Sequence, residues 1–141
     1  MINLSEAFSP IVKVPFGHDL YRISGTVGAT PDAEGKLQAP LGVEAQTQII
    51  FDTLEERLGG VSLNLSHVRE MQVFLDDIED YDVVNGIYVK RFREVIGEEA
   101  PMPARTMLGG LIMPIVADNP LLVEVRGFAS APPFHHLVQE Q

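Results

Sequence analysis

Residues 68–95 read VREMQVFLDDIEDYDVVNGIYVKRFREV and contain two different periodicities, one after the other. Apolar and polar residues alternate over Val68–Leu75, which is typical of a strand with one drier face. After the acidic turn Asp76–Asp80, apolar residues recur at helical spacing over Tyr81–Val95. The acids suit the first turn of that helix, where negative charge meets the positive end of the helix dipole. The apolar stripe of the predicted helix consists of Val84, Tyr88 and Phe92, with Ile87 beside them.

A second helix and two strands are predicted on the N-terminal side of this segment. Residues Gly42–Leu58 carry apolar residues at every fourth position, and the two glycines that follow end the helix. Residues Asp19–Ser24 alternate as a strand does, and a weak first strand is expected at Ile11–Val14. Between strand and helix, Gly25–Pro40 is rich in glycine and proline and is expected to form a long loop. The stripe of the helix consists of Thr47, Ile50, Leu54 and Leu58.

Two more strands are predicted on the C-terminal side. The loop Gly97–Pro103 leads into a strand at Thr106–Met113, whose central glycines indicate a bulge or a close backbone approach. Residues Leu121–Phe128 alternate well and form the last predicted strand. The remaining residues, 131–141, begin Ala-Pro-Pro and end Gln-Glu-Gln, so we expect a tail.

The order of these elements predicts an α+β fold. Strand, helix, strand, helix, strand, strand favours one sheet with two helices packed on a single face. A chain of 141 residues fits one domain, which we place at residues 1–130, ahead of the tail. A sheet covered on one side leaves its other face open, and apolar residues there need another subunit to bury them. We therefore expect an oligomer.

The composition excludes several kinds of site and partner. The chain has no cysteine, which rules out disulfides, thiolate zinc sites and a cysteine nucleophile. Its formal net charge of −10 repels free nucleic acid and anionic membranes. The first residues lack the basic start and apolar core of a signal peptide, and no stretch reaches the roughly 20 apolar residues of a membrane helix. We expect a cytoplasmic protein with neither nucleic-acid nor membrane partners.

Arg105 and Glu124 are the strongest candidates for chemistry. Glu124 lies in an otherwise apolar strand, where a carboxylate is costly to bury unless something pairs with it or uses it. Arg105 lies where a loop enters a strand, and its planar guanidinium fits a carboxylate at two points. Three interpretations follow from the residues alone. The two side chains pair with each other, Glu124 shares a solvated face with Arg126, or both act on a ligand.

Over roughly residues 10–130, the chain resembles the RidA/YjgF family of enamine/imine deaminases. Six short motifs carry the resemblance, and they occur in the family's order. They are Ile23-Ser24-Gly25, Gln46-Thr47, the strand Val68–Leu75 with its acidic turn, Val84-Asn85 with Tyr88 and Phe92, Pro103-Ala104-Arg105-Thr106, and Val123-Glu124-Val125.

The resemblance implies a fold, an assembly and a reaction. The fold is of the chorismate mutase type, a mixed sheet with two helices on one face. The assembly is a homotrimer with ligand sites in the clefts between subunits. The reaction is the hydrolysis of reactive 2-imino and 2-enamino acids, released by pyridoxal-phosphate enzymes, to 2-oxo acids and ammonia. It requires no metal, nucleotide or flavin, so we expect no cofactor.

The resemblance also implies roles for particular residues. Arg105 would hold and orient the substrate carboxylate. Glu124 would position a water and transfer its proton as a general acid and base. Backbone groups near Gly25 and Met107 would hold the substrate, since a glycine permits close approach. Further positions matched to the family's binding pocket are Ser24, Asn85 and Ile11.

The chain departs from the family pattern around the pocket. Ile11 stands where many deaminating members have an aromatic hydroxyl, Thr26 where they often have Gln, and Met107 where they often have Cys. The segment between Arg105 and Glu124 is also a few residues longer. These departures favour a substrate other than the small 2-iminobutanoate type.

Two other functions stay open alongside the deaminase. The first is a non-catalytic trimer that binds a carboxylate metabolite in the same clefts, which would need Arg105 but not Glu124. The second is RNA cleavage or binding, against which the net charge and the lack of a basic, aromatic stripe both count. Asn85 either braces a neighbouring loop or contacts the ligand.

No metal or nucleotide site is predicted elsewhere. The acids at 76–80 lack the spacing of a calcium loop. The glycine-rich stretches do not form a dinucleotide fingerprint. Of the four histidines, His18 is expected in a turn, and the pair in the tail is expected to be solvated. The histidines are His18, His67, His135 and His136.

Overall fold

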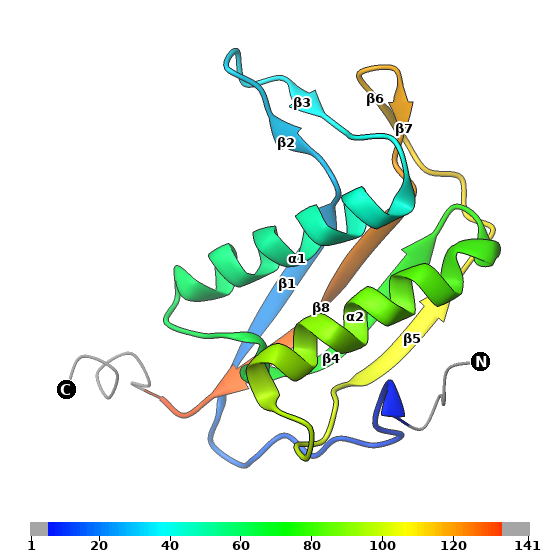
Figure 1. Ribbon diagram of the computed structural model, residues 1–141. Coiled ribbons are helices and arrows are strands. Elements are labelled where there is room, and N and C mark those ends of the chain that lie inside the picture. Colours follow the sequence, from blue (N-terminus) through cyan, green and yellow to red (C-terminus); the bar gives the residue numbers. More distant parts are fainter. Residues whose placement is uncertain (1–5, 134–141) are drawn as a thin grey trace.

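The fold is a mixed four-stranded sheet with two helices on one face, as the order of predicted elements indicates (Figure 1). The computed structural model describes residues 6–133. The strand order is β1-β8-β4-β5, in which β4 and β5 are parallel and the other neighbours antiparallel. The elements are β1 (Asp19–Val27), α1 (Val43–Gly59), β4 (Val68–Leu75), α2 (Tyr81–Ile96), β5 (Ala104–Leu108) and β8 (Val123–Ala131).

The core lies between the helices and the sheet, and the predicted stripes build it. The apolar positions of α1 and α2 are buried against alternate residues of β4, while the intervening residues of β4 face the open side. Phe51 meets the rings of Tyr88 and Phe92 edge-on at 5.8 and 5.9 Å between centroids, a favourable aromatic geometry. The buried members of this core include Ile50, Leu54, Leu58, Met71, Val73, Leu75, Val84, Tyr88 and Phe92.

Two short hairpins project beyond the same end of the sheet (Figure 1). One pairs β2 (Thr30–Pro31) with β3 (Leu37–Gln38), and the other pairs β6 (Ile115–Val116) with β7 (Asn119–Pro120). The side chain of buried Gln46 joins their bases. Its amide nitrogen donates to the Pro40 and Pro120 carbonyls at 3.0 and 2.9 Å, and its oxygen accepts from the Leu122 N–H at 2.8 Å.

Several predicted boundaries were wrong. Residues Ile11–Val14 form no strand, and Ile11 is 86% exposed. The predicted strand Thr106–Met113 starts earlier, at Ala104, and stops at Leu108. Its pairing with β4 ends at Leu108, opposite Phe74, and the next residue, Gly109, packs directly on Ile78, where an added Cβ would lie 2.7 Å from the Ile78 Cβ. The chain then leaves the sheet.

The ends of two other predicted strands differ from the observed ends by a few residues. β1 continues to Val27, three residues into the expected loop, and β8 begins at Val123 and runs to Ala131. β8 therefore includes Ala131, the first residue of the predicted tail. Residues 134–141, which include His135 and His136, lie outside the described residues.

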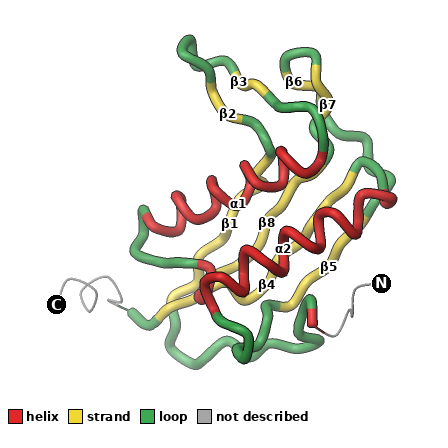
Figure 2. The backbone as a smooth tube through the Cα atoms, viewed as in Figure 1, coloured by secondary structure: helices red, strands yellow, loops and turns green. Residues whose placement is uncertain are grey.

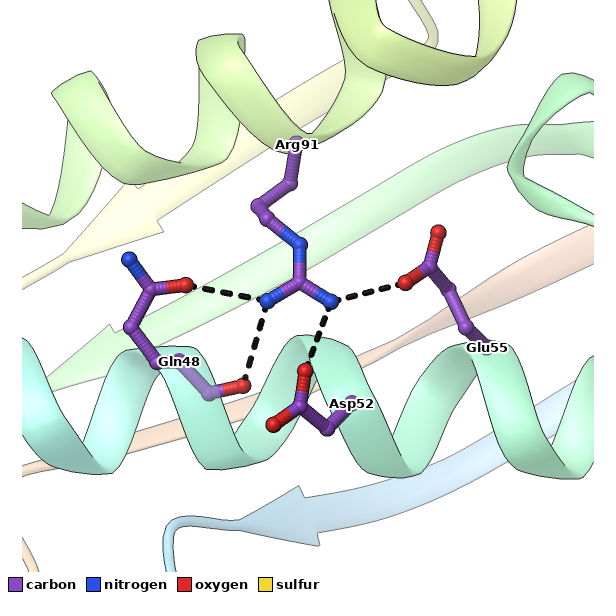
Figure 3. Close-up of polar contacts among 4 residues, drawn as sticks. All are labelled: Gln48, Asp52, Glu55 and Arg91. Atoms are coloured by element: carbon purple, nitrogen blue, oxygen red, sulfur yellow. Dashed lines mark hydrogen bonds and ion pairs between the residues drawn. The ribbon is translucent and has the colours of Figure 1, made fainter.

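Arg91 ties the two helices together (Figure 3). From α2 its guanidinium donates to Glu55, Asp52 and the Gln48 side chain on α1 at 2.7, 2.8 and 2.9 Å. Burial lowers the pKa of Arg91, but the hydrogen bonds to Glu55 and Asp52 outweigh this and raise it overall. The charge of Arg91 is thus satisfied within the chain. Figure 2 shows the same two helices lying side by side over the strands of the sheet.

Candidate functional site

Arg105 lies on the edge strand β5 and points toward the helices. In the parallel register it stands beside Met71, whose side chain is buried in the core, so the two share one face of the sheet. Its Nη1 donates to the Asn85 Oδ1 at 2.5 Å, and its Nη2 donates to the Tyr81 hydroxyl at 2.9 Å. Both partners belong to α2. The guanidinium is thereby fixed at both terminal nitrogens.

Aromatic rings surround the same guanidinium. Its central carbon lies 4.8 Å from the centroid of the Tyr88 ring, 5.3 Å from that of Phe8 and 5.8 Å from that of Tyr81. Ring faces attract a cation without neutralising it. They also limit the access of water to one side of the group.

Phe8 reaches Arg105 because the N-terminal segment is anchored beside β5. The Ser9 N–H donates to the Pro103 carbonyl at 3.1 Å, and the Ser9 hydroxyl donates to the Met102 carbonyl at 2.5 Å. Ala7 is fully buried. These contacts hold residues 7–9 against the start of the strand that carries Arg105.

No carboxylate neutralises Arg105 within residues 6–133, where the ion pairs are those of Arg91. Two further polar atoms near it are buried and have no hydrogen-bond partner among the residues that the structure describes, the Asn85 Nδ2 and the Tyr88 hydroxyl. A cation held by neutral partners, beside unsatisfied polar groups, is well suited to receive an anion. We call Arg105, Asn85 and Met107 the arginine half-site.

Glu124 lies on the opposite, open face of the sheet. On β8 it is half-buried and stands between Phe74 of β4 and Val27 of β1 in the antiparallel register. Its carboxylate has no hydrogen-bond partner in the described part of the chain. Gly25 lies directly against it, since an added Cβ there would stand 3.2 Å from the Glu124 Cδ and Oε1.

A register shift in β1 creates that close approach. The pairing of β1 with β8 breaks between Ile23 and Thr26, so Ser24 and Gly25 form an irregularity beside Glu124. Both residues are exposed. We call Ser24, Gly25 and Glu124 the glutamate half-site.

The two half-sites do not meet within one chain. They lie on opposite faces of the sheet, and β4 separates the two strands that carry Arg105 and Glu124. The interpretation in which these two residues pair with each other is therefore wrong. Arg126 does share the open face with Glu124, but it donates to Gln72 and stacks on Phe74, at 5.3 Å from the ring centroid.

Each half-site adjoins a cavity. A groove of about 490 Å³ runs along α2 and is lined by Asn85, Gly86 and Val89. A second one, of about 410 Å³, is lined by Ser24 and Gly25 together with residues of α1. Arg105 does not itself line the first cavity, nor Glu124 the second, but both residues are partly exposed.

The remaining predicted pocket residues are placed differently. Met107 is half-buried beside Val73, on the same face as Arg105 and two residues further along β5. Ile11 belongs to neither half-site and lies at a hollow beside Pro103, at the start of β5. Asn85 is fully buried, and its side-chain oxygen accepts a hydrogen bond from Arg105. Of the two roles expected for Asn85, this contact supports the bracing role. The group that it braces is the Arg105 side chain and not a neighbouring loop.

Sequence reasoning missed Tyr81, Phe8 and Arg57. Tyr81 stands four residues before Asn85 on α2, which places both on one face of the helix, so its spacing was a usable signal. Arg57 donates from Nη1 to the Thr26 hydroxyl at 2.8 Å, next to the bulge of the glutamate half-site. Neither Arg57 nor Phe8 had a pattern in the sequence that pointed to the site.

The described histidines hold local structure. His18 shares a 3.1 Å hydrogen bond between Nδ1 and the Ser130 hydroxyl, and the Nδ1 of His67 accepts from the Asn64 N–H at 3.0 Å. Within residues 6–133, His, Asp and Glu side chains form no group of three or more that could hold a metal ion. No helix in that part of the chain is long and apolar enough to cross a membrane.

Comparisons with known proteins agree with the fold and the motifs. The family model described as Endoribonuclease L-PSP matches residues 3–131. The chain is 30% identical over 111 residues to Reactive Intermediate Deaminase A, chloroplastic, of Arabidopsis thaliana, covering 79% of this chain and 55% of that protein. The chain thus spans about half the length of this plant relative.

Solved structures share the architecture at low identity. The Rid-family protein YyfB of Yersinia pestis, of unknown function, superposes with a TM-score of 0.69 at 19% identity, over 91% of this chain and 90% of that one. E. coli TdcF with bound serine gives 0.64 at 17% identity, over 89% and 95%. The matched span of the family model, together with the shared fold, shows that the chain belongs to the RidA/YjgF family, whose model is described as Endoribonuclease L-PSP.

Proposed function

We propose that this protein hydrolyses reactive 2-imino and 2-enamino acids to 2-oxo acids and ammonia. The observation that carries the proposal is the guanidinium of Arg105, which is partly exposed, fixed by two neutral partners and not neutralised by any carboxylate of the described residues. The plant relative is named as a reactive intermediate deaminase, which supports the same reaction class. No resident cofactor is needed, because a protonated imine carbon is already electrophilic.

Arg105 binds the substrate carboxylate. A guanidinium and a carboxylate match at two hydrogen bonds, and this fixes the orientation as well as the position of the imine. The ring faces of Phe8, Tyr81 and Tyr88 restrict where the guanidinium can move. The C=N group is then held at a defined place relative to the bound carboxylate.

Glu124 delivers the water. Its carboxylate takes a proton from a water molecule while the water oxygen forms a bond to the imine carbon, giving a carbinolamine. The same carboxyl then returns this proton to the nitrogen. As the C–N bond breaks and ammonia leaves, the carboxylate accepts the proton of the carbinolamine hydroxyl, so that the 2-oxo group forms, and it then passes that proton to the ammonia. The exposed backbone at Ser24 and Gly25 lies beside the carboxylate and offers polar groups to the substrate.

A complete site requires a second copy of the chain. Arg105 lies near one edge of the sheet and Glu124 on the opposite face, so one chain cannot bring both to one substrate. In the homotrimer that we propose, the arginine half-site of one subunit faces the glutamate half-site of the next. Closed rings of this type use one heterologous contact three times.

The anion is a small molecule and not a nucleic acid. With a net charge of −10, the chain repels a polyanion, whereas a single carboxylate needs only one local cation. RNA binding measured over a range of salt concentrations should give no complex, even at low salt.

The test couples the protein to an amino-acid oxidase or dehydratase that releases imines and follows the formation of 2-oxo acid. The parent protein should accelerate it, Arg105→Ala should abolish the acceleration, and Glu124→Gln should reduce it by about a hundredfold or more. Glu70→Gln is a matched control, since Glu70 is half-buried on the same open face. If the parent gives no acceleration over a panel of imines but binds 2-oxo acids, the non-catalytic binding module replaces this proposal.

Mixing the two inactive variants tests the shared site. Co-refolded Arg105→Ala and Glu124→Gln chains form hybrid trimers in which about a quarter of the sites pair an intact arginine with an intact glutamate. Activity should therefore reappear on mixing. Its absence, in a mixture shown to exchange subunits, would place both groups of each site in one subunit and contradict the assembly.

A further inference from the structure

The hydroxyl of Tyr81 has one unused hydrogen-bonding function. It accepts the Nη2–H of Arg105 at 2.9 Å, and a phenol that accepts a hydrogen bond keeps its own proton to donate. No acceptor for that proton lies within residues 6–133. Tyr81 is half-buried at the first position of α2, and its hydroxyl is not among the buried polar atoms of the described residues that lack a hydrogen-bond partner.

The unused proton lies next to the place where an anion would bind Arg105. Nη1 is held by Asn85 and Nη2 by Tyr81, which fixes the plane of the guanidinium. Nη2 carries a second N–H besides the one given to Tyr81. This second N–H diverges from the one given to Tyr81, so a carboxylate can span the two donors: one of its oxygens accepts the N–H and its other oxygen accepts the proton of the Tyr81 hydroxyl.

We infer that Tyr81 is a second anion-binding residue, which orients Arg105 through its oxygen and donates its own proton to the carboxylate that Arg105 binds. This inference rests on the proposed function, and it assigns Tyr81 a role in recognising 2-imino and 2-oxo carboxylates. A charged acceptor makes such a hydrogen bond stronger than one between neutral groups. The two donors together select a carboxylate over an uncharged group of the same shape.

Tyr88 provides the matched control on the same helix. Its ring also lies against Arg105, but its hydroxyl is fully buried and makes no hydrogen bond to the guanidinium. Tyr81→Phe and Tyr88→Phe each remove one hydroxyl and keep one ring face. Only the first removes a partner of Arg105.

Calorimetry with 2-oxobutanoate and with 2-oxobutanamide tests the inference without requiring turnover. Tyr81→Phe should weaken binding of the carboxylate by about tenfold and leave binding of the amide unchanged. Tyr88→Phe, which keeps both hydrogen bonds of Arg105, should lose far less of the affinity for the carboxylate than Tyr81→Phe does. In the imine assay, Tyr81→Phe should raise KM by a similar factor and change kcat less, because the lost contact exists in the ground state and the transition state alike.

The possible failures are distinguishable. If the parent binds 2-oxobutanoate and Arg105→Ala does not, but Tyr81→Phe binds as the parent does, the role of Tyr81 is overturned and the proposed function stands. An equal loss of carboxylate and amide binding in Tyr81→Phe would show that the hydroxyl only supports the local structure. If the parent binds no member of a panel of 2-oxo acids that includes 2-oxobutanoate and larger analogues, both proposals fall.

Discussion

Arg91 and Arg105 are both partly buried arginines that contact α2 or belong to it, yet their charges are handled in opposite ways. Arg91 donates to two carboxylates and a glutamine oxygen on α1 (Figure 3). Arg105 donates to an amide and a phenol and has no carboxylate partner in the described residues. The first arginine is saturated by its own chain, and the second is positioned but not neutralised. This difference separates an arginine that serves the fold from the one that we propose binds the substrate.

Giving Arg105 an internal carboxylate should produce the largest effect. In Asn85→Asp, the new carboxylate replaces an amide whose oxygen accepts from Nη1 at 2.5 Å and whose nitrogen is unpartnered. It should neutralise Arg105 and repel the substrate, so binding of 2-oxobutanoate should weaken by about a hundredfold. Calorimetry measures the affinity, and thermal unfolding shows that the variant is folded.

A matched change at the other arginine should leave binding intact. Gln48→Glu adds a carboxylate beside Arg91, which already has two. Its affinity for 2-oxobutanoate should equal that of the parent. If Gln48→Glu weakened binding as much as Asn85→Asp, the effect would come from net charge and not from the neutralisation of Arg105.

Removing Arg91 should affect stability instead of function. Arg91→Ala deletes the tie between the helices and the contact of the guanidinium with the Phe51 ring, at 5.6 Å from its centroid. We expect a loss of about 1–2 kcal/mol in the free energy of unfolding, because two ion pairs with a mostly buried arginine are broken. Urea unfolding measures this loss, while the imine assay should give an unchanged kcat. A large fall in kcat with unchanged stability would make Arg91 part of the site.

The two carboxylates on Arg91 should differ in importance. The side chain of Asp52 is 70% exposed and that of Glu55 is 37% exposed, so water screens the first pair more than the second. Glu55→Gln should cost about 0.5 kcal/mol and Asp52→Asn less, as measured by urea unfolding at low salt. A larger loss for Asp52→Asn would show that exposure does not rank these pairs.

The sequence predicted the layers because long elements carry a clear period. The stripe Ile50, Leu54 and Leu58 and the alternation over Val68–Leu75 span enough residues to define a buried face. The short hairpins were missed because two-residue strands carry no period. Residues Ile11–Val14 were wrongly assigned because three of these four residues are β-branched and favour a strand, yet no partner strand lies beside them.

The candidate site residues were chosen by residue type, and their geometry was not predicted. Arg105 and Glu124 stood out as charges next to apolar strand residues. Their placement on opposite faces depends on the register of β4 with both neighbours, which local sequence does not encode. Tyr81 was missed because its role arises only when α2 packs above β5 and brings its hydroxyl to Arg105.

Asp80, in the acidic turn before α2, lies beside other carboxylates and, like Arg105, has no partner of opposite charge among the described residues. Its replacement should give the smallest change in stability. Burial, and then the charges of Asp77 and Asp76, raise the pKa of Asp80 above its ordinary value of 3.8. The folded state therefore holds this proton more tightly than the unfolded state does. The resulting stability is present at low pH and is lost as the pH rises through the folded pKa. Asp80→Asn should consequently raise the Tm slightly at neutral pH, and this gain should disappear well below pH 3.8.

Asp32 supplies the control with the opposite sign. Hydrogen bonds from the backbone of Lys36 and Glu34 lower the pKa of this exposed carboxyl. Its contribution to stability is therefore present at neutral pH and is lost as the pH falls through the folded pKa. The Tm of Asp32→Asn should be lower than that of the parent at neutral pH, and the difference should vanish in acid. The Tm of Asp80→Asn should be higher than that of the parent at neutral pH, and this difference should also vanish in acid. Shifts of the same sign in the two variants would mean that the surrounding partners do not decide whether a charge in this protein stabilises the fold.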